Sequence, residues 1–292
     1  MFSLVISQTN LLHYYCIQTA FPLYNNIIPM PLTIYQVDSF TDRPFAGNPA
    51  GVCILSEPKT ELWMQSVAKE MNVAETAFLV PQGDDFSLRW FTPAVEVDLC
   101  GHATLASAHI LWESGALTHG AEARFHTKSG LLTANQADGW IVLNFPSTPP
   151  EPADMPPLVG EAIGVPAVYC GKSPFDYLIE VESEAIVREL NPDLRKIATA
   201  SARGVIVTAR SSSADQDFVS RFFAPQAGVD EDPVTGSAHC ALGPYWRSKL
   251  GKDSMLAYQA SPRGGFVRVT VQGDRVLLGG KAVTVLKAEL LA

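Results

Sequence analysis

Several ionisable side chains stand in short motifs of apolar or small residues, where proton-transfer chemistry is expected. Glu75 lies in the motif NVAETAF and is flanked by apolar residues. A carboxyl group in apolar surroundings has its neutral form favoured, so it can both give and take protons near neutral pH. Four more acid–base candidates lie near two glycines further along the chain: Asp98, Cys100, His102 and Asp232. Together these residue types predict general acid–base catalysis.

An internal repeat relates the motifs around these candidates. The string RWFTPAVEVDLCGHA covers residues 89–103, and RFFAPQAGVDEDPVTGSA covers residues 221–238. Each begins with Arg, an aromatic residue and Phe, continues through a loop with Asp, and ends on Gly, a polar residue and Ala at the start of a small-residue helix. We interpret the repeat as two similar domains that face each other. The simpler alternative is that helices rich in small residues begin alike.

The repeat also predicts an anion site. If the two helix starts converge, their unpaired N–H groups and positive dipole ends favour a bound carboxylate. Gly101 and Gly236 carry no Cβ, so the backbone can approach a ligand closely there. Asn48, in the motif AGNPAG, is a further candidate for orienting substrate, although a role in a turn is the simpler interpretation. Cys100 is predicted to line the site and Cys240 to be buried.

Local patterns predict many strands and few helices. Residues 60–71 place apolar residues four apart, and either Ser56 or Thr60 can cap them, which predicts an amphipathic helix. Residues 101–114 are almost free of charge, so their helix should be buried on most sides. Alternating or β-rich runs predict strands at 32–40, 52–55, 74–80, 86–92, 124–136, 140–146, 167–171, 176–181, 204–209, 219–225, 266–272 and 276–290. Two further helices are predicted, one ending near residue 190 and one beginning at 235.

Composition excludes several classes of protein. The chain has 292 residues, 47% of them hydrophobic and 17% charged, with a formal net charge of -9. This acidic balance argues against nucleic-acid and anionic-membrane partners. No apolar run is long enough to span a bilayer, and the five cysteines form no CxxC pair, so we expect a cytoplasmic protein with neither disulfides nor a metal site. Motifs for dinucleotides, P-loop nucleotides, hydrolase nucleophiles and zincins are absent, which favours chemistry without a cofactor.

A domain boundary is predicted in the proline-rich stretch 147–157, which is too rich in Pro for regular structure. It separates an N-terminal domain, residues 31–150, from a C-terminal domain, residues 158–292, whose last strand could pack back on the first domain. Residues 1–30 are interpreted as an N-terminal extension. A packed arm, a disordered segment and a start site placed too far upstream are all compatible with its uncharged, aromatic composition.

Four ordered motifs resemble the PhzF-like isomerase family of phenazine biosynthesis, a branch of the diaminopimelate-epimerase-like fold. They are VDSFTDRPFAGNPAGV (37–52), MNVAETAFLV (71–80), RWFTPAVEVDLCGHATLASAH (89–109) and RFFAPQAGVDEDPVTGSAHCALGPYW (221–246). The resemblance spans about residues 32–290. It implies an α+β fold of two similar domains, each a mixed or antiparallel sheet or barrel wrapped around a central helix. The active site would lie between the two domains of one chain and would catalyse proton shifts without a cofactor. The resemblance also implies a homodimer.

The same resemblance implies roles for individual residues. Glu75 matches the general acid/base of the family, while His102, Asp232 and Ser237 match residues that contact substrate. Backbone amides around Gly101 and Gly236 would then hold the carboxylate of a small substrate.

Two alternatives stay open beside a cofactor-independent isomerase. Epimerase relatives of the fold carry a catalytic cysteine at each helix start, whereas this chain has Cys100 at the first and Thr235 at the second. A one-cysteine amino-acid or hydroxy-acid epimerase is therefore one alternative, with the pKa of the thiol lowered by the helix N-terminus. The other is a catalytically silent binding or interaction protein on the same fold.

Overall fold

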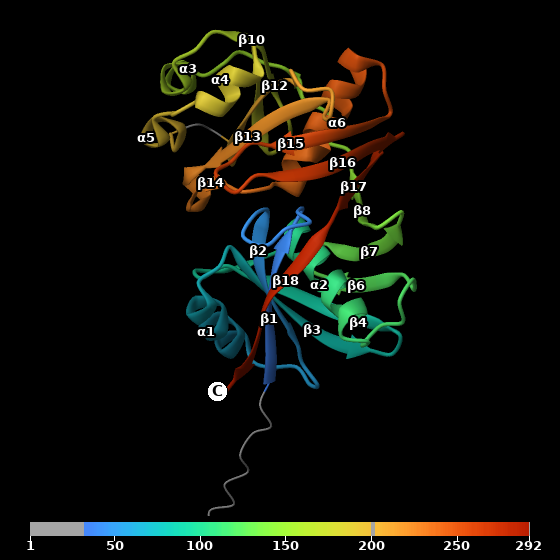
Figure 1. Ribbon diagram of the computed structural model, residues 1–292. Helices are drawn as coiled ribbons and strands as arrows, with labels where there is room; N and C mark the ends of the chain where they lie inside the picture. Colours follow the sequence, from blue (N-terminus) through green and yellow to red (C-terminus); the bar gives the residue numbers. More distant parts are fainter. Residues whose placement is uncertain (1–31, 200–201, 292) are drawn as a thin grey trace, which may run out of the picture.

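The computed structural model describes residues 32–199 and 202–291, which form two lobes stacked end to end (Figure 1). The predicted extension 1–30 lies outside the described residues. The predicted α+β class is confirmed, because each lobe is a mixed sheet around one buried helix, α2 or α6. Within the described part of the chain, no helix is both long enough and apolar enough to cross a membrane.

The first lobe alternates strands with two long helices. Its elements are β1 (Leu32–Ser39), β2 (Asn48–Ile54), α1 (Glu61–Met71), β3 (Glu75–Gln82), β4 (Asp85–Phe91), β5 (Glu96–Val97), α2 (Gly101–Glu113), β6 (Ala123–Thr127), β7 (Gly130–Ala137) and β8 (Trp140–Pro146).

The second lobe has the same plan with short added helices. Its elements are β9 (Glu151–Pro152), α3 (Pro157–Ile163), β10 (Ala167–Lys172), β11 (Asp176–Val181), α4 (Glu184–Glu189), α5 (Leu194–Ile197), β12 (Gly204–Arg210), β13 (Phe218–Ala224), a 3-10 turn (Pro225–Ala227), β14 (Val229–Asp232), α6 (Gly236–Leu250), β15 (Ser254–Gln259), β16 (Gly265–Gln272), β17 (Arg275–Gly280) and β18 (Ala282–Leu290).

Strand directions repeat between the lobes. In the first lobe β2 runs parallel to β3, β3 antiparallel to β4, and β4 parallel to β6. In the second lobe β11 runs parallel to β12, β12 antiparallel to β13, and β13 parallel to β15. The central helices occupy matching places, since α2 connects β5 to β6 and α6 connects β14 to β15. The repeated string in the sequence is therefore the visible part of a repeat of the whole topology.

Two strand pairings join the lobes, and a third holds the segment that connects them. Strand β8 lies antiparallel to β17, so the two sheets share one ladder. Strand β9, in the connecting segment, pairs with β10, the first full strand of the second lobe. Strand β18 returns from the second lobe to pair along the whole of β1, as the long red strand in Figure 1 shows.

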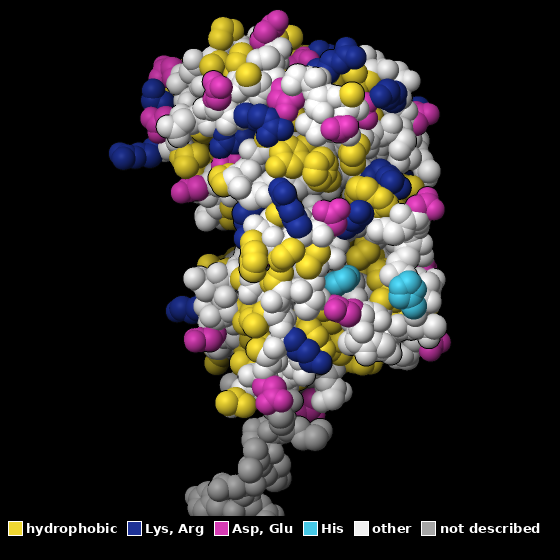
Figure 2. Space-filling view, viewed as in Figure 1, with side chains coloured by type: hydrophobic (Ala, Val, Ile, Leu, Met, Phe, Trp, Pro, Cys, Tyr) yellow, Lys and Arg dark blue, Asp and Glu magenta, His cyan; other side chains and the backbone are white. Residues whose placement is uncertain are grey.

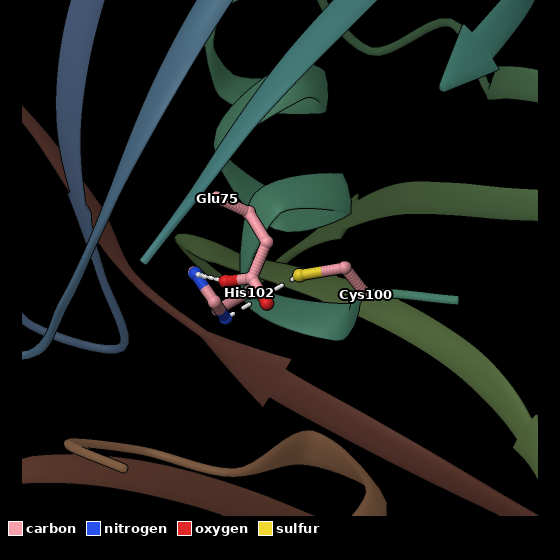
Figure 3. Close-up of side chains that lie close together, drawn as sticks. All are labelled: Glu75, Cys100 and His102. Carbon is pink, nitrogen blue, oxygen red and sulfur yellow. Dashed lines mark hydrogen bonds and ion pairs between the residues drawn. The ribbon is translucent and has the colours of Figure 1, made fainter. Parts of the chain in front are cut away.

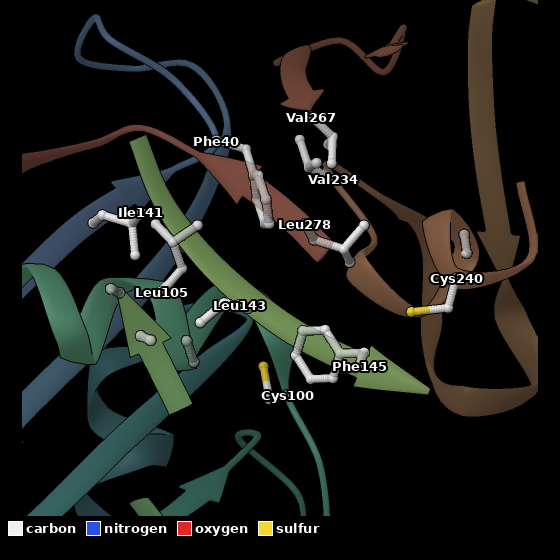
Figure 4. Packing of buried hydrophobic residues seen from close by; sticks show 14 of the residues in the cluster. Phe40, Cys100, Leu105, Ile141, Leu143, Phe145, Val234, Cys240, Val267 and Leu278 are labelled. Carbon is white, nitrogen blue, oxygen red and sulfur yellow. The ribbon is translucent and has the colours of Figure 1, made fainter. Parts of the chain in front are cut away.

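The largest hydrophobic cluster runs through both lobes (Figure 4). It includes Leu105 of α2 and Leu242 of α6, together with Phe145 of β8 and Leu278 of β17 from the shared ladder. All residues of α2 from 102 to 108 are buried, which explains why this helix carries so little charge. Burial on this scale holds the starts of the two central helices in fixed positions.

Local signals account for helix α1. The Oγ1 atom of Thr60 accepts a hydrogen bond from the N–H of Trp63 and caps the helix, while Met64 and Val67 face the core. Asn72 ends the helix with a left-handed backbone (φ 49°), a conformation that asparagine tolerates. The helix predicted over 60–71 is confirmed.

The stretch predicted to lack regular structure contains some. Glu151–Pro152 forms β9, and α3 begins at Pro157 and ends before Gly164, whose φ is 67°. Proline suits the first turn of a helix because its fixed φ is already helical and its missing N–H has no partner there. Strand β15 was not predicted either, because its inward positions include the weak strand formers Ala257 and Gln259.

His239, within α6, should make stability depend on pH. Its side chain is fully buried, its Nδ1 lies 2.7 Å from the carbonyl oxygen of Thr235, and burial lowers its pKa to about 4. The unfolded chain binds this proton near pH 6.5 and the native state only near 4, so stability falls as the pH drops between those values. We expect a contribution of about 2 kcal/mol between pH 7 and pH 5, measured by urea unfolding.

The variant His239→Gln should lose that part of the pH dependence. His119→Gln is the matched control, because His119 is exposed and should leave the slope unchanged. An equal loss of stability on acidification in wild type and His239→Gln would show that another group is responsible.

Candidate active site

Three residues of the first lobe form a compact acid–base cluster (Figure 3). Glu75 begins β3, Cys100 directly precedes α2, and His102 is the second residue of α2. The Oε2 atom of Glu75 lies 3.1 Å from Nε2 of His102, and the Sγ atom of Cys100 lies 3.5 Å from Nδ1. The Glu75 contact has an ion-pair distance without hydrogen-bond geometry, so the buried Nε2 has no hydrogen-bond partner among the described residues.

Backbone geometry places Glu75 at the edge of the first lobe. The left-handed Asn72 stops α1, and the chain enters β3 after only two more residues. In the parallel register of β2 and β3, Glu75 lies opposite Ala50. Its side chain is 19% exposed, so this carboxylate is partly shielded yet accessible.

Asn48 connects this cluster to the second lobe. Its Nδ2 donates to Oδ1 of Asp232 at 2.8 Å and to the carbonyl oxygen of Val234 at 2.9 Å, and lies 3.2 Å from Nδ1 of His102. Asn48 is fully buried and begins β2. The interpretation of Asn48 as a turn residue was therefore wrong, since its side chain bridges the two lobes.

Asp232 ends β14 and is held by its own lobe as well. The hydroxyl of Thr235 donates to Oδ2 at 2.6 Å, and Nε2 of Gln259 donates to the main-chain oxygen of Asp232 at 2.7 Å. Thr235, not Asp232, is the N-cap residue of α6, and no side chain makes a capping hydrogen bond to that helix. Gln259 was missed because a single glutamine at the end of an unpredicted strand gives no signal.

The two central helices begin against each other. A Cβ added at Gly101 would lie 3.6 Å from Cα of Gly236, and the converse distance is the same. Helix starts carry unpaired N–H groups and the positive end of the dipole, so their meeting favours an anion. The gap is an ordinary van der Waals distance, so protein packing alone does not demand glycine at either position.

Charges within the cluster depend on each other. Burial favours a neutral imidazole, but Cys100 and Glu75 more than offset it and raise the pKa of His102 well above its ordinary value. Burial, with the Glu75 carboxylate, raises the pKa of Cys100. Because the thiol then stays protonated at neutral pH, the Glu75 carboxylate is the anion that stabilises the imidazolium. The predicted lowering of the thiol pKa was wrong, because burial and the Glu75 carboxylate raise it by more than His102 and the backbone of Ala103 lower it.

The pKa of Asp232 is shifted in the direction expected for a buried carboxyl group. Desolvation raises the pKa of Asp232, although hydrogen bonds from Thr235 and Asn48 favour its charged form. Cys240 is buried as predicted, and burial raises its pKa to about 12. Asp98 is exposed and lies outside the cluster, its carbonyl oxygen accepting a hydrogen bond from Ser129.

Ser237 lies on the second-lobe side and has a partner that the sequence did not reveal. Its Oγ accepts a hydrogen bond from Nη2 of Arg203 at 2.9 Å. Arg203 in turn forms a two-pronged pair with the buried Asp176. Neither residue belongs to a recognisable motif, because the pair is 27 residues apart and only the sheet brings it together.

The cluster also has the donor types that a cation could use. The ligand atoms of Glu75, Cys100 and His102 lie within 4.8 Å of one another, and thiolate, imidazole and carboxylate are zinc ligands. A cation would have to displace the proton from a thiol whose pKa is raised.

The sequence matches the family described as phenazine biosynthesis-like protein over residues 37–288. The chain belongs to the PhzC-PhzF family. Among its PhzC-PhzF relatives, an uncharacterized isomerase of Halalkalibacterium halodurans is 54% identical over 263 residues, covering 90% of this chain and 99% of the relative. A crystal structure of a PhzF-family protein from Enterococcus faecalis has a TM-score of 0.86 at 39% identity and covers 89% of this chain and 99% of its own.

The PhzC-PhzF fold extends to more distant proteins. A probable proline racemase from Agrobacterium radiobacter has a TM-score of 0.59 at 13% identity, covering 89% of this chain and 92% of its own, which shows a shared fold alone. The family predicted from the four motifs is thus confirmed. The structure brings Asn48, Glu75, Cys100, His102 and Asp232 into one cluster with Gly101 and Gly236 beside it, while their roles in catalysis stay predictions.

Proposed function

We propose that this protein is a cofactor-independent isomerase that moves a proton between carbons of a small carboxylate-bearing substrate, with Glu75 as general base and acid. The supporting observation is the pairing of a partly exposed carboxylate with a buried histidine where two helix starts meet. The curated relative from Halalkalibacterium halodurans, named an isomerase, supports the reaction class.

The geometry suggests how each group would act. Glu75 takes a proton from a substrate carbon, and the positive ends of α2 and α6 stabilise the negative charge that develops on the substrate. The His102 imidazolium, next to Glu75, is a second electrostatic support. Asn48 and Asp232 hold the two lobes in register, so that the proton on Glu75 can be returned to a second carbon of the same bound molecule.

Hydrogen exchange with solvent tests the proposal. Glu75 can exchange its proton with water while it holds it, so a true substrate should lose carbon-bound hydrogen in D₂O. We expect proton NMR to show washout at one position of at least one compound among small amino, hydroxy and cyclohexadiene carboxylates. Silence across the panel, while one of these compounds binds, would favour a binding protein on this fold.

A one-cysteine epimerase is the second candidate, because Cys100 lies within reach of His102. The raised pKa of the Cys100 thiol weakens this candidate, because only the thiolate form can take up a proton from the substrate. Washout that persists in Cys100→Ala would eliminate the thiol as the base. Washout that disappears there, in a protein with unchanged thermal melting, would favour the epimerase.

A further inference from the structure

Strand registers give residues of the first lobe counterparts in the second. Arg89 of β4 lies opposite Phe78 of β3, and Arg221 of β13 lies opposite Val207 of β12. The two arginines begin the repeated strings, and each makes a two-pronged hydrogen-bonded pair with a glutamate of the next strand, Glu96 of β5 or Glu231 of β14. Phe78 and Val207 are therefore equivalent positions.

Counting back three residues from this pair makes Gly204 the counterpart of Glu75. The matching helix starts make Ser237 the counterpart of His102. Position 204 has no room for a side chain, because a Cβ there would lie 2.5 Å from Cζ of Phe222. The second lobe therefore cannot present a carboxylate where the first lobe presents Glu75.

Arg203 places a positive charge beside Ser237, where the first lobe has the negative charge of Glu75 beside His102. Its Nη2 donates to Oγ of Ser237 at 2.9 Å, just as Glu75 approaches His102 in the first lobe. The carboxylate of Asp176, which is only 1% exposed, accepts hydrogen bonds from Nε of Arg203 at 3.0 Å and from Nη2 at 2.5 Å. These two bonds fix the plane of the guanidinium.

Two sets of donors remain available around Arg203. Its Nη1 makes no hydrogen bond within the described residues, and its side chain is 40% exposed. Arginine has no acceptor, so Ser237 must accept from it and is free to donate its own hydrogen elsewhere. Ser237 is also the second residue of α6, where backbone N–H groups lack helical partners.

We propose that Arg203 adds a guanidinium contact to the anion site that the family resemblance implies at Ser237 and the start of α6, and that it there receives an acidic group of the substrate across from Glu75. The assignment of Glu75 as the opposite half rests on the proposed function. A planar guanidinium with free N–H groups matches a carboxylate, so the site selects acids over their neutral amides. Arg203 acts as the specificity-determining residue, and Asp176 positions it.

Binding of simple acids and their amides tests this proposal without any turnover. We would titrate benzoate against benzamide and malonate against malonamide by calorimetry. At least one acid should bind the wild-type protein at least tenfold more tightly than its amide. Arg203→Gln should reduce this ratio to below threefold, and Arg203→Lys should keep part of it. Arg247→Gln is the matched control, because Arg247 pairs with Asp253 near the opposite end of α6.

A second variant separates binding from folding. Removing Arg203 leaves the carboxylate of Asp176 buried without its partner, so Arg203→Gln can lower the melting temperature. The double variant Asp176→Asn/Arg203→Gln removes both charges and should lose the acid preference in a folded protein. An acid preference retained by the double variant, or none in wild type, would overturn the proposal. Glu75→Gln should keep the preference for acids over amides, because Glu75 is not part of the anion site. The binding experiment therefore tests the role of Arg203 independently of whether Glu75 transfers the proton.

Discussion

Replacing Glu75 by Gln is expected to abolish proton exchange while leaving the fold intact. Glutamine keeps the size and one oxygen of the side chain but cannot take a proton at neutral pH. General acid–base groups typically contribute about 10²- to 10⁴-fold to rate, so the washout of substrate hydrogen in D₂O should slow by at least that factor. The side chain is partly exposed and makes no well-formed hydrogen bond to His102, so thermal melting should change little.

The variant Glu57→Gln is the matched control for this experiment. Glu57 is exposed and its carboxylate pairs with Lys59 among the residues that the structure describes, so its neutralisation should leave washout unchanged. Glu75→Asp gives a graded test, because it retains a carboxylate and withdraws it by one methylene from His102. Exchange by Glu75→Gln at a rate within threefold of wild type would exclude Glu75 as the proton carrier.

Replacing Asn48 by Asp is expected to destabilise the junction between the lobes, because the new carboxylate would repel that of Asp232. The substitution is nearly isosteric, yet it places an oxygen where Nδ2 now donates to Asp232 at 2.8 Å and to Val234 at 2.9 Å. A buried charge without a partner costs about 3–5 kcal/mol, and the His102 imidazolium, whose Nδ1 lies 3.2 Å from Nδ2 of Asn48, would offset part of this cost. We expect a loss of stability smaller than that in urea unfolding, and a loss of washout activity because displacement of the lobes by about 1 Å costs about 100-fold.

The reciprocal change identifies the cause of that loss. The double variant Asn48→Asp/Asp232→Asn restores one amide and one carboxylate across the lobe junction. It should recover part of the stability, while Asp232→Asn alone removes the acceptor charge and should destabilise less than Asn48→Asp. Additive effects of the two substitutions would contradict direct coupling between these side chains.

Periodic patterns in the chain predicted the secondary structure well where they were strong. Helix α1 carries its own cap and stop in Thr60 and Asn72, and α2 shows its burial by its lack of charge. These signals are local, so they are legible without the fold. The prediction that residues 147–157 lack regular structure was wrong, because tertiary pairing with β10 stabilises β9 despite its proline.

Electrostatic environment was the least predictable property. A thiol at a helix start is expected to ionise easily, yet Cys100 is desolvated and lies beside the carboxylate of Glu75, and both effects raise its pKa. Burial alone lowers the pKa of His102, yet Cys100 and Glu75 raise it by more. Such shifts depend on which groups surround a side chain in three dimensions, and sequence spacing does not contain that information.

Residue types and their order by themselves determined the family, the repeated plan and the membership of the first-lobe cluster. These follow from strings of adjacent residues such as NVAETAF and DLCGHA, in which short-range order is enough. Only the tertiary structure decided that Asn48 reaches Asp232 across 184 residues, and that Arg203 stands beside Ser237 where the second lobe has no room for a carboxylate. Those contacts arise because strand register and lobe packing bring distant residues within a few ångströms, and no local pattern records which residues will meet.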